Sequence, residues 1–224
     1  MMKINRQRWF VLNHDLPFKE SIAEFSFSKE SGIGFEVIEA KAGLVRARFI
    51  ERIEVIEEAS SPYGELERVS VTRYVHFEFA VTKISSEVSL IKVINPPASL
   101  RAFVGMLMES LQFRASLTKV DFDLCAVYRS IAEDESIDRL MVNKVTVSQV
   151  PLGRHATSKI EVVSTENALA EFLDNYTAPT MKVEKLSISL RVGHESEVLE
   201  LTSAGSIRCT PGVEFFLEKE VSIT

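Results

Sequence analysis

Arginine side chains recur at even-numbered positions of two neighbouring stretches, residues 44–56 and 68–81. A tyrosine and a histidine share this pattern, and the full set is Arg46, Arg48, Arg52, Arg68, Tyr74 and His76. Because successive side chains of a strand point to opposite faces, these six residues share one sheet face if both stretches are strands. Guanidinium groups on such a face can contact phosphates, and an aromatic ring between them can stack on a base. The pattern therefore makes a nucleic acid or another polyanion one candidate ligand.

The same face also holds residues that favour two other interpretations. Glu54 and Glu78 lie among the arginines, and cross-strand pairs of opposite charge often complete a solvent-exposed sheet. Ile50 and Ile56 lie there too, as they would if another segment or another chain covered this face. An ordinary exposed face is the first interpretation, a protein contact is the second, and a polyanion site is the third.

The odd-numbered positions of the two stretches are almost entirely apolar, which is the pattern of half-buried strands. Residues 59–64, Ala-Ser-Ser-Pro-Tyr-Gly, have the composition of a turn. If the chain turns about position 62, the two charges of the apolar face, Glu51 and Arg73, lie directly opposite each other. We therefore predict a long antiparallel hairpin with a Glu51–Arg73 ion pair.

Two carboxylates, Asp121 and Asp123, lie two residues apart in a strand-like stretch, residues 119–128. On one face of a strand they would be suitable ligands for a hard cation, although polar residues on the solvent side of a sheet give the same spacing. A metal-dependent hydrolase or nuclease that uses scattered carboxylates is therefore an alternative function. The four histidines lie far apart in the sequence, and three of them are in or beside predicted turns.

The common catalytic and cofactor-binding motifs are absent from the sequence. It contains no GxGxxG or GxxxxGK phosphate loop, and no GxSxG, HExxH or CxxC motif. The two cysteines, Cys125 and Cys209, lie in apolar or strand-like surroundings and are predicted to be structural thiols. We expect no cofactor, and the absence of these motifs favours a non-enzymatic protein but leaves an enzyme as an alternative.

Residues 96–114 have the pattern of a helix that is apolar on two sides. Leu100, Phe103 and Leu107 recur at steps of three and four residues, which places them on one face. The other side carries small or apolar residues, namely Ala102, Gly105 and Met106. We predict one central buried helix here. Its small-residue side is expected to pack within its own fold or, alternatively, against a second helix or a neighbouring subunit.

The remaining periodicities predict a second helix and two more hairpins. The helix spans residues 165–176, and the hairpins join residues 140–150 to 158–163 and residues 183–192 to 197–202. The predicted fold class is therefore α+β, with a mostly antiparallel sheet, long hairpins, a central buried helix and a shorter second helix.

The length of the chain, 224 residues, suits one compact domain that spans residues 1–224. A polar break at Asp134-Glu-Ser suggests an organisation in two halves, residues 1–133 and 134–224. Residues 91–103 align over residues 160–172 with matching apolar positions, as they would in a weak ββαβ-like repeat. Shared secondary structure alone gives the same matches.

Composition limits the classes of function. The net charge of −6 argues against a protein that coats nucleic acid generally. The sequence has no run of 18 apolar residues and no signal-peptide region, so we expect no membrane association and a cytoplasmic location. The leading prediction is a non-enzymatic binding or assembly protein. It would dock a protein partner, or a second copy of itself, through a sheet face or the central helix.

Overall fold

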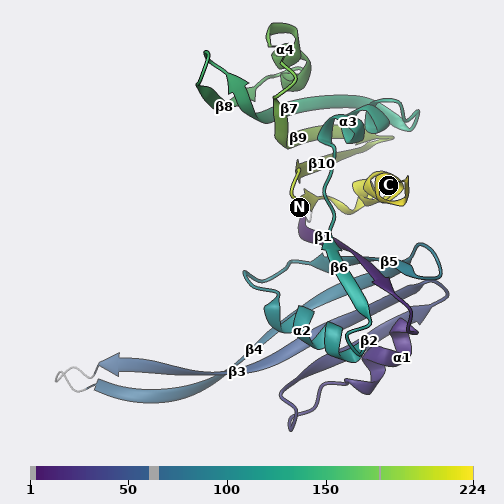
Figure 1. Ribbon diagram of the computed structural model, residues 1–224, viewed down its shortest axis with the longest axis vertical. Coiled ribbons are helices and arrows are strands. Elements are labelled where there is room, and N and C mark those ends of the chain that lie inside the picture. Colours follow the sequence, from purple (N-terminus) through teal and green to yellow (C-terminus); the bar gives the residue numbers. More distant parts are fainter. Residues whose placement is uncertain (1–3, 61–65, 177, 224) are drawn as a thin grey trace. The chain divides into compact units, whose positions relative to one another are not determined.

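The computed structural model of the protein describes residues 4–60, 66–176 and 178–223, and it divides the chain into two compact units (Figure 1). The first unit is Phe10–Thr118, and the second unit combines Met1–Trp9 with Lys119–Thr224. Both units are built mainly from antiparallel strands with helices packed against them, so the α+β, mostly antiparallel class is confirmed.

The first unit contains strands whose order in its sheet is β2-β3-β4-β5-β1, with β6 paired to β1. The pairs β2–β3, β3–β4 and β4–β5 are antiparallel. Strand β1 belongs to both units, because its residues 5–8 pair with β11 of the second unit. The elements are β1 (Asn5–His14), α1 (Phe18–Glu24), β2 (Ile33–Lys41), β3 (Leu44–Ser60), β4 (Leu66–Lys83), β5 (Val88–Ile94), α2 (Arg101–Ser110) and β6 (Ala115–Lys119).

The second unit has the strand order β8-β7-β9-β10-β11, followed by the first residues of β1. Its elements are α3 (Leu124–Ala132), β7 (Ile137–Pro151), β8 (Thr157–Val163), α4 (Ala168–Asn175), β9 (Lys182–Val192), β10 (Glu195–Thr202), β11 (Ser206–Cys209), the 3₁₀ turn η1 (Pro211–Val213) and α5 (Glu214–Ile223). Both predicted hairpins are present, and β9 turns into β10 at Gly193, whose φ of 59° suits glycine.

An aromatic cluster forms the core of the first unit. The ring of Phe103 on α2 lies 5.1–5.7 Å, centroid to centroid, from Phe49, Phe77 and Phe79, and 6.3 Å from Phe35. These rings meet mostly edge to face, which is the favourable geometry for aromatic pairs. The odd-numbered face of the β3–β4 hairpin is therefore the core face, as its period-two pattern predicts.

The prediction of one central buried helix is not confirmed. The described residues form five α-helices, and the predicted helix of residues 96–114 is shorter, because α2 spans Arg101–Ser110. Pro96 and Pro97 disfavour helical backbone before Arg101, and Gln112 and Phe113 take left-handed φ values of 53° and 55° after Ser110. Helix α2 buries one face, while its other side remains partly exposed.

Aliphatic side chains form most of the core of the second unit. Helix α3 packs against β7 and β9, α4 packs against β7 and β8, and α5 packs against α3. The buried aliphatic strand residues include Val142, Val145, Val147, Val150, Leu186, Ile188, Leu190, Leu199, Leu201 and Ile207. Helix α4 corresponds to the predicted helix of residues 165–176 but begins only after Asn167, whose side chain accepts a hydrogen bond from the backbone N–H of Ala170 at 3.0 Å.

The prediction of a strand over residues 119–128 is wrong beyond Lys119. Strand β6 ends there, and α3 begins at Leu124. The carboxylate of Asp123 accepts hydrogen bonds from the backbone N–H groups of Cys125 at 3.0 Å and Ala126 at 3.2 Å. Asp123 is therefore a helix N-cap, a role that competes with strand structure at this position.

The two units differ from the expected halves. Their boundaries lie at residues 9/10 and 118/119, whereas the sequence suggests a division between residues 133 and 134. The two segments of the predicted ββαβ-like repeat correspond to β4-β5-α2-β6 and β7-β8-α4-β9. They share the order strand, strand, helix, strand along the chain. Their strand order in the sheet differs, because β9 pairs with β7 whereas β6 pairs with β1.

Candidate functional site

The β3–β4 hairpin extends beyond the rest of the first unit as a two-stranded ribbon (Figure 1). Strand β2 accompanies β3 only as far as Glu51, and β5 accompanies β4 only over Phe79–Lys83. We call the residues 52–58 and 68–74 the arm. In the part of the chain that the structure describes, no third strand pairs with the arm on either edge.

The register of the hairpin differs from the predicted one by two residues. Glu51 lies opposite Val75, and Arg73 lies opposite Ile53, so the predicted Glu51–Arg73 ion pair is wrong. Arg73 instead forms an ion pair with Glu57. The pairing centres on position 63, one residue later than predicted, and a shift of two partners leaves every side chain on its predicted face. Residues 61–64 of the predicted turn lie outside the described residues.

An apolar stripe runs along the odd-numbered face of the hairpin, and helix α2 covers only one end of it. Under α2, Phe49, Phe77 and Phe79 are buried. In the arm the odd-numbered positions also include the paired charges Glu57 and Arg73, and the apolar side chains among them lie partly exposed, with Val69 46% exposed. We call the residues Ile53, Val55, Val69 and Val71 the arm stripe.

Element length explains where the cover stops. The 17 residues of β3 extend over about 55 Å at ~3.3 Å per residue, whereas the 10 residues of α2 extend over about 15 Å. Sequence reasoning did not predict that the arm stripe is exposed, because its alternation of apolar residues is the same as that of a buried strand face. The sequence did contain one signal of an uncovered face, because the predicted strands are longer than the predicted helix.

Carboxylates accompany the predicted arginine face, which is the even-numbered face of the hairpin. Arg46 and Arg48 both form ion pairs with Glu78, at 3.4 and 3.3 Å, and Arg48 also pairs with Glu36 at 3.0 Å. Arg68 pairs with Glu58 at 3.1 Å. Each such exposed pair contributes about 0–1 kcal/mol to stability. A phosphate would have to compete with these carboxylates for the same guanidinium groups.

The remaining predicted residues of this face do not converge on one point. Arg52 donates a hydrogen bond to the carbonyl oxygen of Lys29 at 2.9 Å and lies opposite Tyr74, whose ring meets Phe27 edge-on at 6.4 Å. His76 lies opposite Ile50 and is exposed. Arg68 lies six residues before Tyr74 on the same strand, which is about 20 Å away at ~3.3 Å per residue. The structure thus spreads the six residues along the hairpin.

The small-residue side of α2 is less closely packed than the prediction of a buried helix implies. Gly105 is exposed, and a Cβ atom placed on it would have no heavy atom within 4 Å among the described residues. Ala102 and Met106 are half-buried at the margin of the core. Close packing within the fold therefore does not explain Gly105, and a helix or subunit contact here stays a prediction.

The candidate metal ligands and thiols have other roles. Asp121 is exposed, Asp123 caps α3, and no group of three or more metal-ligating side chains gathers among the described residues. Burial raises the pKa of the Cys125 thiol, and the neighbouring Asp123 carboxylate raises this pKa further, which disfavours a reactive thiolate. Cys209 is buried.

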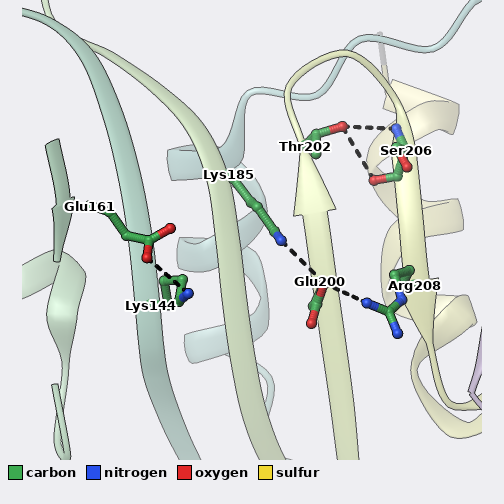
Figure 2. A network of polar contacts seen from close by, with 7 residues as sticks. All are labelled: Lys144, Glu161, Lys185, Glu200, Thr202, Ser206 and Arg208. Carbon is green, nitrogen blue, oxygen red and sulfur yellow. Dashed lines mark hydrogen bonds and ion pairs between the residues drawn. The ribbon is translucent and has the colours of Figure 1, made fainter. Parts of the chain in front are cut away.

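The sheet of the second unit carries its own set of cross-strand polar contacts (Figure 2). Lys144 pairs with Glu161 at 2.9 Å, and Glu200 pairs with Lys185 at 3.3 Å and Arg208 at 3.4 Å. The backbone N–H of Ser206 donates to the Thr202 hydroxyl at 3.0 Å. Each cation drawn has a carboxylate partner, and Lys185 and Arg208 share the same one, Glu200.

Comparison with known proteins adds no functional assignment. No protein-family model matches the chain, and no curated protein matches it. Among solved structures, the chain is similar to DynU16, a protein of the dynemicin biosynthetic locus, with 10% sequence identity and a TM-score of 0.22. That match covers 96% of this chain and 92% of DynU16. Within the described residues, no helix is both long enough and apolar enough to span a bilayer.

Proposed function

We propose that this protein is a non-enzymatic assembly protein that self-associates through the arm of the β3–β4 hairpin. The observation that supports this proposal is the arm stripe, which continues the core face of the sheet beyond the end of helix α2. A two-stranded ribbon by itself is marginally stable in water, so the arm gains stability when another surface covers it.

The stripe provides the hydrophobic part of the contact. Ile53, Val55, Val69 and Val71 are β-branched side chains with few rotamers, so little side-chain entropy is lost when they pack. Each Å² of apolar surface removed from water contributes about 25 cal/mol. On the opposite face Ile56 is 69% exposed, which adds a second apolar contact point.

A second copy of the chain is the partner that suits the arm best. Two copies of the same surface that pack face to face are related by a two-fold axis, which is the common symmetry of homodimers. The arm carries three arginines and three glutamates, Arg52, Arg68, Arg73, Glu54, Glu57 and Glu58, on a chain whose net charge is −6. Two arms therefore meet without the charge repulsion that the rest of the surface would impose.

The test is the mass of the protein in solution, measured by light scattering over a range of concentrations. Val55 and Val71 lie directly opposite each other, so the double variant Val55→Glu/Val71→Lys replaces the apolar contact by a cross-strand ion pair and preserves the hairpin. We expect the wild type to dimerise and the double variant to remain monomeric with an unchanged circular dichroism spectrum.

The matched control is Thr72→Lys, which introduces a charge on the opposite face of the same strand, across from Glu54. We expect this variant to dimerise like the wild type. A wild-type protein that is monomeric at every concentration would reject self-association. A stable complex of that monomer with a different protein, lost in the double variant, would assign the arm to a heterologous partner instead.

A further inference from the structure

A cavity of about 440 Å³ lies at one end of the core of the first unit, away from the arm. Its walls come from the end of β1, the start of α1, the β2–β3 turn, the end of β4 and the start of β5. Its apolar lining includes Leu16, Phe18, Val45 and Val81. The volume lies at the lower end of the roughly 300–1,000 Å³ that is typical of small-molecule sites.

Three polar side chains from neighbouring strands line this cavity. Lys83 of β4 lies directly opposite Ser89 of β5, so both side chains are on the same face of the sheet. The next strand, β1, supplies His14, whose Nε2 lies 3.0 Å from the hydroxyl oxygen of Ser89. The sheet therefore places an ammonium, a hydroxyl and an imidazole side by side at one end of an apolar cavity.

The hydrogen bonds of His14 determine its tautomer. Nδ1 lies 2.7 Å from the carbonyl oxygen of Leu16, which can only accept, so Nδ1 carries a proton. In the neutral ring Nε2 then accepts from the hydroxyl of Ser89, a residue that is only 3% exposed. The ring packs edge-on against Phe18 at 6.2 Å. Ser89 and His14 thus form a rigid polar end of the cavity.

The charges around the cavity favour an anion. Three lysines line it, Lys19, Lys41 and Lys83, against the two carboxylates Asp15 and Glu20. Asp15 is already paired with Arg114, and Lys41 is paired with Glu39. Lys19 and Lys83 form no ion pair within the part of the chain that the structure describes. On a chain of net charge −6, this is a locally cationic opening above an apolar wall.

We infer that this cavity binds a small monocarboxylate with an apolar body. The carboxylate would lie against the ammonium group of Lys83, and the apolar body would contact Phe18, Val45 and Val81. Among the described residues, no arginine lines the cavity, and phosphate recognition usually relies on bidentate arginine or on several backbone N–H groups. A singly charged carboxylate is therefore a better match than a phosphate.

Titration of the 224-residue protein with sodium octanoate, followed by two-dimensional NMR, tests this inference. Octylammonium chloride serves as the probe of opposite charge and equal chain length. We expect saturable shifts of residues 14–20, 41–45 and 81–89 with octanoate and none with octylammonium. The absence of saturation up to about 10 mM octanoate, or equal binding of the two probes, would overturn the inference.

Variants separate a specific contact from a general effect of charge. Lys83→Met is expected to weaken octanoate binding about tenfold or more, because hydrogen bonds to charged groups contribute more than neutral ones. Ser89→Ala removes the hydroxyl that holds His14, so it is expected to weaken binding by a smaller factor. Lys29→Met removes an exposed lysine that does not line the cavity, and it should leave binding unchanged. Equal losses in Lys83→Met and Lys29→Met would show that only net charge matters.

The cavity and the arm share no residue, so the result of this titration does not depend on whether the protein self-associates through the arm.

Discussion

The two units use the same construction but differ in how far their helices cover the sheet. In the second unit, α3 and α4 lie over strands whose inward side chains, such as Val145 and Ile188, are buried. In the first unit, β3 and β4 extend past the end of α2, and the same alternating pattern continues into solvent. An apolar face in the sequence is therefore a core only where another element covers it.

The solvent faces of the two sheets are more alike. Both carry rows of cross-strand ion pairs, around Glu78 in the first unit and around Glu200 in the second. Such pairs contribute little stability individually. Their effect is to leave neither face with an uncompensated block of charge.

Removal of the central aromatic ring of the first unit should have the largest effect on stability. Phe103 is 1% exposed and contacts four other phenylalanines, so we expect Phe103→Ala to cost about 3–5 kcal/mol. Val71→Ala in the partly exposed arm should cost less than about 1 kcal/mol. Urea unfolding of both variants measures the difference, and similar losses would mean that the arm is as well covered as the core.

Two glycines of the second unit should respond differently to the same change. Gly205 and Gly193 both have left-handed φ values, 75° and 59°. A Cβ on Gly205 would overlap the carbonyl oxygen of Val120, whereas one on Gly193 meets open space. We expect Gly205→Ala to cost about 2–3 kcal/mol and Gly193→Ala about 1 kcal/mol in thermal unfolding. Equal costs would show that the loop before β11 yields to the added methyl group.

The exposed glycine of α2 provides a prediction of opposite sign in the first unit. Gly105 is helical, and its missing side chain faces open space. We expect Gly105→Ala to raise the unfolding free energy by about 0.5–1 kcal/mol, because alanine favours the helix and restricts the unfolded chain. A loss of stability or of dimer mass would instead indicate that this side of α2 contacts a partner.

Variants of the arginine face test whether a polyanion can bind arginines that already form ion pairs with carboxylates. The triple variant Arg46→Ala/Arg48→Ala/Arg52→Ala should change stability by less than about 2 kcal/mol, since exposed pairs are weak. We expect the wild type to show no retention on single-stranded DNA or RNA at low salt. Salt-sensitive retention that the triple variant loses would establish the polyanion site instead.

The smallest effect concerns a half-buried carboxylate of the second unit, Asp134. Hydrogen bonds from the hydroxyl and backbone N–H of Ser136, and then the ammonium of Lys219, lower the pKa of Asp134 to about 2. A lowered pKa adds stability above about pH 4, and this contribution is lost as the pH falls to about 2. Asp134→Asn should therefore be less stable than the wild type at pH 7 and equal to it near pH 2. Asp138→Asn, a change in a nearby exposed carboxylate, controls for net charge.

The sequence by itself determined the class of the fold and the positions of its hairpins. Alternation over residues 44–56 and 68–81 specifies which side chains share a face, and Gly193 specifies the turn between β9 and β10. These features are local, because strand period and turn geometry depend on residues close together in the chain.

Only the tertiary structure decided register, helix limits and sites. Alternation survives a shift of two residues, so the pattern does not distinguish Arg73 opposite Glu51 from Arg73 opposite Ile53. In the same way, a cap at Asp123 is invisible to a pattern of alternate polar residues. His14 lies about seventy residues from Lys83 and Ser89, and only the strand order β4-β5-β1 brings the three together. Likewise, α2 leaves the arm uncovered only because it is shorter than the strands on which it packs, and this comparison requires the tertiary structure.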